Sequence, residues 1–203
     1  MELHFTPGTV SIAVAIALEE AGIAYTPRLV DFESAAQTKA PYLAINPKGR
    51  VPALVTSQGV LTETGAILDY IGTLAPAMIP TDPFAAGRMR EVMYYLASTM
   101  HVAHAHKMRG SRWADQEASF ADMKAKVPQT VAASCAYIET ELALSPFVLG
   151  DKMTLADPYL FIIASWGAGD GVDMSTYPKL AAFLDMMRAR QSVQSVIQKG
   201  LLT

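Results

Sequence analysis

The chain has 203 residues, of which 51% are hydrophobic, and its 16 Lys and Arg against 19 Asp and Glu give a formal net charge of −3. A chain of this length and apolar content can bury a sizeable core, in one large domain or two small ones. The slightly acidic balance offers no basic surface for nucleic acid or for an anionic membrane.

The cysteine content and the apolar runs bear on the cellular compartment. A single cysteine, Cys135, excludes an internal disulfide and a zinc site built on cysteines. We expect it to be a buried small hydrophobic residue within a helix. The first residues lack a positive segment followed by a long apolar core, and no run of about 18 uncharged apolar residues occurs. We therefore expect a cytoplasmic protein.

The first part of the chain alternates strand and helix patterns. We predict strands at residues 3–5 and 25–30 around a helix over 10–22, then a short helix over 40–45, a hairpin of residues 53–56 and 60–62, and a helix over 64–74. The strand–helix–strand unit implies a parallel pair, and the hairpin an antiparallel one. This is the element order of a thioredoxin-like α/β domain, which we place at residues 1–76.

Proline residues separate this part from a helical remainder. Residues 75–83 hold three prolines, which the interior of a helix or sheet does not tolerate, so we place a linker at residues 77–83. Helices are predicted over 84–109, 115–143, 154–167 and 177–198. Residues 84–203 are thus predicted to form an all-helical bundle domain. Within it, Thr154 and Asp157 have the spacing of a capping box.

The segment 46–54, Asn-Pro-Lys-Gly-Arg-Val-Pro-Ala-Leu, is predicted to present backbone to a small peptide. Pro52 opens a short apolar run and has no N–H for a strand ladder, so the preceding Val51 is pushed into an extended conformation. Val51 can then offer its own N–H and C=O to a ligand chain. The sequence leaves open whether the Val51–Pro52 bond is cis or trans.

The start of the predicted helix over 64–74 is a candidate anion site. Its unpaired N–H groups and positive dipole end can accept a carboxylate, with the Thr64 hydroxyl as a further donor, and Glu63 can pair with an ammonium group. A free amino-acid head group fits this pair of charges. The alternative is that Thr64 is an ordinary N-cap and Glu63 a solvated charge.

Four stretches, in this order, resemble those of glutathione transferases, with the bacterial beta-like branch nearest. Residues 6–11, Thr-Pro-Gly-Thr-Val-Ser, resemble its first loop, residues 46–54 its cis-proline loop, residues 63–64 its acidic and hydroxyl pair, and residues 154–157 its capping box. The resemblance covers nearly the full chain. It implies a homodimer that uses glutathione as co-substrate, without a metal, and conjugates it to a small hydrophobic electrophile held against the helical domain.

The same resemblance implies roles for individual residues. Val51 would pair with the cysteinyl backbone of glutathione, and Glu63 and Thr64 would hold the γ-glutamyl head. Pro52 would be cis, and Arg50 and His101 are assigned to glutathione binding as well. His101, His104 and His106 make a poor metal site, because His106 lies well round the helix from His101 and no acidic third ligand is near.

The expected chemistry needs a glutathione thiolate, which a hydroxyl at the start of the first helix can stabilise. Ser11 is the preferred candidate, followed by Thr9 and Thr6. The beta-like branch has a cysteine where this chain has Val10, so mixed-disulfide chemistry is excluded, and Phe5 lacks the hydroxyl that a tyrosine supplies in other branches. Three alternatives stay open: a glutathione-dependent peroxidase or isomerase, a non-catalytic glutathione-binding protein, and a thioredoxin-like interaction module.

Overall fold

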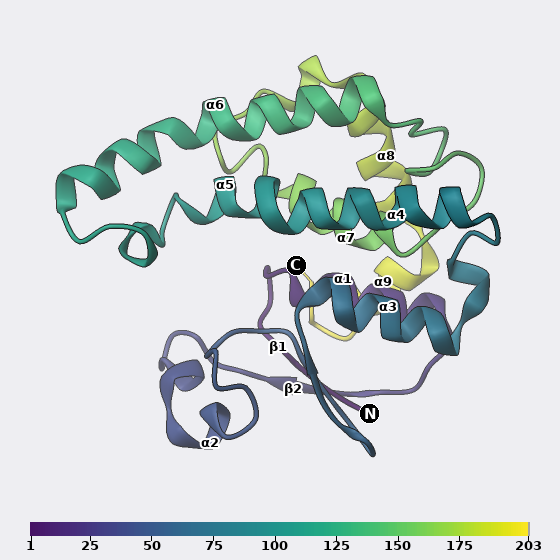
Figure 1. Cartoon of the computed structure of the whole chain (residues 1–203), viewed down its shortest axis with the longest axis horizontal. Helices are drawn as coiled ribbons and strands as arrows, with labels where there is room; N and C mark the ends of the chain where they lie inside the picture. Colours follow the sequence, from purple (N-terminus) through teal and green to yellow (C-terminus); the bar gives the residue numbers. More distant parts are fainter. Residues whose placement is uncertain (203) are drawn as a thin grey trace. The chain divides into compact units, whose positions relative to one another are not determined.

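A computed structural model describes residues 1–202, which divide into two compact units (Figure 1). The first unit comprises residues 1–80 together with the segment from residue 187 onward, and the second comprises residues 81–186. The segment from residue 187 onward thus groups with residues 1–80. The domain bounds expected from the sequence, 1–76 and 84–203 with a linker at 77–83, stay predictions.

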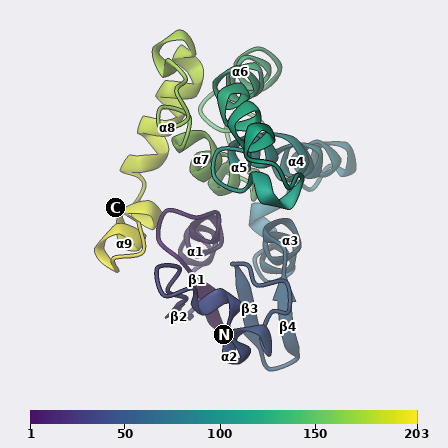
Figure 2. The same ribbon diagram turned by 90° about the vertical axis from the view of Figure 1, so that its left-hand side faces the viewer.

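The first unit is built on a four-stranded mixed sheet, and the expected thioredoxin-like fold is confirmed. Its elements are β1 (Glu2–Phe5), α1 (Ser11–Glu20), β2 (Thr26–Leu29), α2 (Ala40–Leu43), β3 (Ala53–Thr56), β4 (Gly59–Thr62) and α3 (Thr64–Leu74). The strand order is β2-β1-β3-β4, with β1 parallel to β2 and antiparallel to β3. In both views α1 and α3 lie side by side over one face of the sheet, and α2 lies on the other side (Figure 2).

Helix α1 forms the centre of this unit. Its residues 11–18 are all buried, as expected for a helix that is apolar all round. It packs on the sheet and α3, and helix α9 (Gln191–Gln198) lies against it. Strand β2 is exposed along its whole length and contains Pro27, which suits an edge strand because proline cannot donate to a ladder.

The second unit is helical, as predicted. It contains α4 (Pro83–Tyr95), a π-helical turn (Leu96–Met100) and α5 (His101–Ala105), which follow one another without a break, then α6 (Glu117–Glu141) and α7 (Ala156–Ser165). Helix α8 (Pro178–Ala189) runs across the boundary at residue 187. Short 3-10 turns occur at Ala36–Thr38, Pro76–Met78, Gly110–Arg112 and Met174–Thr176. In Figure 1, α6 runs alongside the α4–α5 helix.

Two predicted helices differ from the observed ones. The helix expected over 84–109 ends at Ala105 and contains the π-helical turn. The helix expected over 177–198 is two helices, because Arg190 is extended, with φ −66° and ψ 144°. This break lets the apolar residues Val193 and Val196 of α9 be buried in the first unit. Neither proline nor glycine marks the break, so the sequence pattern carried no sign of it.

Part of the predicted capping box at the start of α7 is present: the Asp157 carboxylate accepts from Thr154, but Leu155 stands at the N-cap, and the Thr154 hydroxyl donates to the carboxylate instead of accepting from the Asp157 N–H. The Asp157 carboxylate is fully buried and accepts hydrogen bonds from the backbone N–H of Thr154 at 2.7 Å and from its hydroxyl at 3.0 Å. Its second oxygen accepts from the N–H of Val148 at 2.8 Å. Asp157 therefore fixes both the helix start and the loop before it.

Candidate functional site

The sheet register brings three separate loops to one end of the first unit. His4 of β1 pairs with Ala53 of β3, and Ala53 pairs with Thr62 of β4. The residues that follow β1, precede β3 and follow β4 therefore leave the sheet at the same end. These are the loop of residues 6–10, the segment ending in Val51–Pro52, and the start of α3. The three motifs found in the sequence are thus brought together by strand pairing.

The loop before β3 is held by side chains that bond its backbone. Asn46 is buried, and its amide donates to the Arg50 carbonyl at 2.6 Å while its Oδ1 accepts from the N–H of Lys48 at 3.1 Å. The hydroxyl of Tyr42 donates to the same Arg50 carbonyl at 2.6 Å. Sequence reasoning missed Tyr42, whose position one helical turn before Asn46 was the available signal.

Gly49 lets the loop before β3 pack closely against the backbone of Gln37. Its φ is +60°, and a Cβ placed there would lie 3.0 Å from the carbonyl oxygen of Gln37. A side chain at this position would therefore meet both backbone strain and a close backbone contact. Glycine is needed for the loop to hold its shape.

Val51 has an unused backbone edge. The Val51–Pro52 bond is cis, as the resemblance implied. Within residues 1–202 the N–H and C=O of Val51 have no hydrogen-bond partner, and the residue is half-buried. The adjacent Arg50 is exposed, and its guanidinium has no partner within the same residues. A ligand can therefore add to this edge without displacing a protein hydrogen bond.

Glu63 and Thr64 form the third part of this region. Glu63 stands at the N-cap of α3 with φ 68° and ψ 120°, a conformation that costs an ordinary residue about 1–3 kcal/mol. Lys48 donates to its Oε1 at 2.5 Å and to the Thr62 hydroxyl at 2.7 Å. Thr64 is the first residue of α3 and is buried. Thr64 is therefore not the N-cap residue, whereas the Glu63 side chain is 65% exposed and is a solvated charge paired with Lys48.

The hydroxyls of the first loop are bonded to one another. The Ser11 Oγ accepts from the N–H of Thr6 at 3.2 Å and lies 2.7 Å from the Thr9 Oγ1, which itself lies 2.7 Å from the Thr6 carbonyl oxygen. The Thr6 hydroxyl donates to the Val30 carbonyl at 2.6 Å. Ser11 is fully buried, whereas Thr9 and Thr6 are half-buried. Of the three candidates, Ser11 is therefore the least accessible to a ligand.

The histidines of the second unit meet two tryptophans. The rings of His101 and His104 lie 5.3 and 4.2 Å from the Trp166 ring, whereas His106 lies 4.5 Å from Trp113. His106 thus faces away from the other two, as their spacing predicted. In the part of the chain that the structure describes, no group of three or more His, Cys, Asp or Glu side chains could hold a metal ion. No helix within it is long and apolar enough to cross a membrane.

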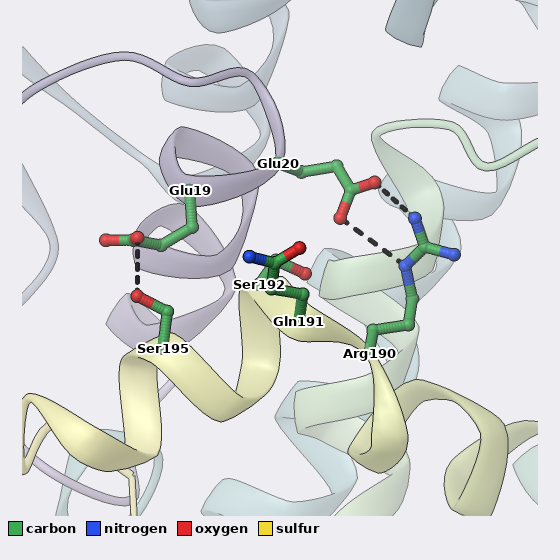
Figure 3. Close-up of a pocket in the computed structure, with 6 residues that line it drawn as sticks. All are labelled: Glu19, Glu20, Arg190, Gln191, Ser192 and Ser195. Carbon is green, nitrogen blue, oxygen red and sulfur yellow. Dashed lines mark hydrogen bonds and ion pairs between the residues drawn. The ribbon is translucent and has the colours of Figure 1, made fainter.

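A separate polar cavity of about 320 Å³ lies between the end of α1 and the start of α9 (Figure 3). Glu20 pairs with Arg190 on one side of it, and Glu19 accepts from Ser195 at 2.7 Å and from Lys199 on the other. Its charges therefore compensate each other and join α9 to α1. Sequence reasoning missed this cavity, which involves none of the predicted site residues.

Comparison with known proteins gives two family matches that together cover most of the chain. Residues 3–73 match the glutathione S-transferase N-terminal domain, and residues 95–191 match the C-terminal domain of the same family. A solved glutathione transferase homolog from Sulfitobacter, with bound glutathione, is 59% identical, with a TM-score of 0.97 over 99% of this chain and 98% of that one.

Two curated relatives carry different activities in their names. The glutathione S-transferase GstA of Escherichia coli O157:H7 is 28% identical, over 97% of both chains. A maleylacetoacetate isomerase of Pseudomonas aeruginosa is 27% identical, over 89% of this chain and 87% of the isomerase. Relatives of this chain thus include both a transferase and an isomerase by name.

Proposed function

The chain belongs to the glutathione S-transferase family, and from that premise we propose that it conjugates the glutathione thiolate to a small hydrophobic electrophile. The observation that carries the glutathione part is the free backbone edge of Val51, which lies at the same sheet end as the start of α3. The glutathione bound to the 59% identical Sulfitobacter homolog supports the same ligand.

The proposed binding mode follows from the groups available at this sheet end. The cysteinyl backbone of glutathione pairs with Val51 as an added strand would. The γ-glutamyl carboxylate meets the first N–H groups of α3 and the Thr64 hydroxyl, where the helix dipole favours an anion. The ammonium group meets the Glu63 oxygen that Lys48 leaves free. Arg50 offers an unpaired guanidinium to a further carboxylate. His101 keeps the glutathione-binding role that the resemblance implied.

The proposed thiolate donor is Thr9, with Ser11 as the residue that positions it. Lowering a thiol pKa from about 8.5 by two units takes about 2.7 kcal/mol. If Ser11 donates to the Thr9 Oγ1, the Thr9 proton can turn from the Thr6 carbonyl to the sulfur. The Thr9 hydroxyl then gives up its neutral hydrogen bond to the Thr6 carbonyl for one to the thiolate. The bond to the charged sulfur is the stronger of the two. Thr9 is the better donor to a ligand because it is half-buried, whereas Ser11 is fully buried.

An isomerase is the second candidate, favoured by the maleylacetoacetate isomerase relative. Stoichiometry separates the two: conjugation consumes one glutathione per turnover, whereas isomerisation consumes none. We would supply the purified protein with glutathione and either chlorodinitrobenzene or a cis-configured maleyl keto acid. Thioether product formed from the aryl chloride supports the transferase, and cis–trans conversion at constant glutathione supports the isomerase. If the protein catalyses neither reaction, both proposals are overturned, and a non-catalytic binding protein is left.

The assembly and compartment are also proposals that rest on the family. A homodimer in the cytoplasm is the family expectation, with a chain mass of 21.8 kDa. Light scattering after size-exclusion chromatography should give twice this mass. A stable species of single-chain mass at working concentrations would overturn the dimer.

A further inference from the structure

The backbone carbonyl of Arg50 is held by two buried side chains. The Tyr42 hydroxyl and the Asn46 amide each donate to it at 2.6 Å. Tyr42 is 5% exposed and Asn46 is 1% exposed, so both bonds are shielded from water. The Asn46 amide is itself oriented, because its Oδ1 accepts from the N–H of Lys48 at 3.1 Å. A carbonyl oxygen has two lone pairs, and both are therefore occupied here.

These bonds also set the direction of the Val51 N–H. The peptide group between Arg50 and Val51 is planar and trans, so its N–H points opposite to its C=O. Because the C=O points to the side chains of Tyr42 and Asn46, the N–H points away from both of them. That N–H has no partner within residues 1–202. Its direction is thus set by groups that a ligand does not displace.

The second donor does more than satisfy a buried carbonyl. One hydrogen bond is enough to offset the cost of burying a backbone C=O, and Asn46 supplies it. The bond from Tyr42 removes the remaining freedom of the peptide plane. Hydrogen bonds in a chain also polarise one another, so an amide whose C=O accepts twice is a stronger donor at its N–H. The Tyr42 hydroxyl therefore favours an acceptor at the Val51 N–H.

The Tyr42 side chain is fixed by its own surroundings. Tyr42 lies on α2, and its ring contacts the ring of His4 on β1, with 5.8 Å between the two centroids. Its backbone carbonyl accepts from the N–H groups of Ile45 and Asn46, both at 2.9 Å, which ties α2 to the start of the loop before β3. The hydroxyl is thus held in place before any ligand binds, as a positioning group requires.

We propose that Tyr42 is a positioning residue for glutathione, which aims and strengthens the Val51 N–H as a donor to the carbonyl of the cysteinyl residue. This rests on the proposed function, in which the cysteinyl backbone pairs with Val51. The carbonyl is the only backbone acceptor that the cysteinyl residue offers. A thiol without this carbonyl gains nothing from the N–H, so Tyr42 contributes to the selection of peptide thiols.

A pair of short ligands isolates the cysteinyl carbonyl. γ-Glutamylcysteinamide and γ-glutamylcysteamine share the γ-glutamyl head and the thiol, and they differ by the carboxamide that contains this carbonyl. We would titrate ¹⁵N-labelled wild type and Tyr42→Phe with both ligands and with glutathione, and follow the amide resonances. Tyr70→Phe is the matched control, because the Tyr70 hydroxyl, on α3 of the same unit, has no hydrogen-bond partner among the described residues.

Tyr42→Phe removes one hydrogen bond and keeps the ring and the Asn46 bond. We expect it to weaken the binding of glutathione and γ-glutamylcysteinamide about three- to tenfold, and that of γ-glutamylcysteamine less than about 1.5-fold. Tyr70→Phe should leave all three affinities near wild type. Equal weakening of the two short ligands, which a general distortion of the loop would cause, overturns the role of Tyr42. No weakening of glutathione binding overturns it as well.

The Val51 amide resonance gives a second readout, which in the wild type does not depend on the stability of a variant. Its proton should shift downfield with glutathione and γ-glutamylcysteinamide, as expected when it forms a hydrogen bond, but not with γ-glutamylcysteamine. The downfield shift should be smaller in Tyr42→Phe. The same response to all three ligands overturns the proposal while glutathione binding stands. If the wild type does not bind glutathione, the proposed function itself is wrong, and the role of Tyr42 falls with it.

Discussion

Removing the Asp157 carboxylate should destabilise the protein more than any exposed substitution. Asp157→Ala leaves two buried backbone N–H groups, those of Thr154 and Val148, without their acceptor. It also removes the partner of the Thr154 hydroxyl. Each unsatisfied buried donor costs about 1–3 kcal/mol, and the loss of the helix cap adds about 1 kcal/mol. We expect a total loss of about 3–7 kcal/mol in the free energy of unfolding.

The assay is urea denaturation followed by circular dichroism, with Asp151→Ala as the matched control. Asp151 is exposed and lies in the same loop before α7, so its removal should change stability by less than about 0.5 kcal/mol. Asp157→Asn keeps the shape and one acceptor and should fall between the two. If Asp157→Ala cost less than about 1 kcal/mol, these buried donors would not depend on the carboxylate, and the reasoning would be refuted.

Three further predictions concern the binding site and the first and second units. Thr64→Ala should weaken glutathione binding by about 1–3 kcal/mol, measured by calorimetry, and unchanged affinity would remove this hydroxyl from the site. Burial raises the pKa of Glu19, but its bonds with Lys199 and Ser195 outweigh this and hold the pKa below its ordinary 4.5. Its stabilising contribution is therefore present above pH 4.5 and lost as the pH falls through the folded pKa. Glu19→Gln should flatten that acid loss of stability, and an unchanged pH profile would contradict the pairing. Burial, with a smaller effect of the Asp170 charge, raises the pKa of the Cys135 thiol to about 11. The folded protein should therefore resist maleimide labelling at pH 8, whereas the protein unfolded in urea should be labelled rapidly. Rapid labelling of the folded protein would contradict this.

Local sequence signals predicted the elements whose limits are set by nearby residues. Helix α3 begins at Thr64 and ends at Leu74, as expected, because the hairpin before it and the apolar spacing within it are both local. The break at Arg190 depends instead on burying the apolar face of α9 in the first unit, together with the pairing of Arg190 with Glu20. Residues far away in the chain set that requirement, so no local pattern could reveal it.

Local sequence likewise predicted some residues of the candidate site and not others. Val51 and Glu63 could be found because a proline and a helix start restrict the backbone near them. The ranking of Thr9 above Ser11 as thiolate donor could not be predicted, since it depends on which hydroxyl faces inward once α1 is packed.

The central claim is that glutathione binds as a thiolate at the sheet end where the loop of residues 6–10, Val51 and the start of α3 come together. The direct measurement is a pH titration of thiolate absorbance for glutathione bound to the wild type and to Thr9→Val. We predict a bound thiol pKa clearly below the free value of about 8.5 in the wild type, and a return toward that value in the variant, with affinity little changed. Binding without a lowered thiol pKa, or no binding at all, would contradict the account.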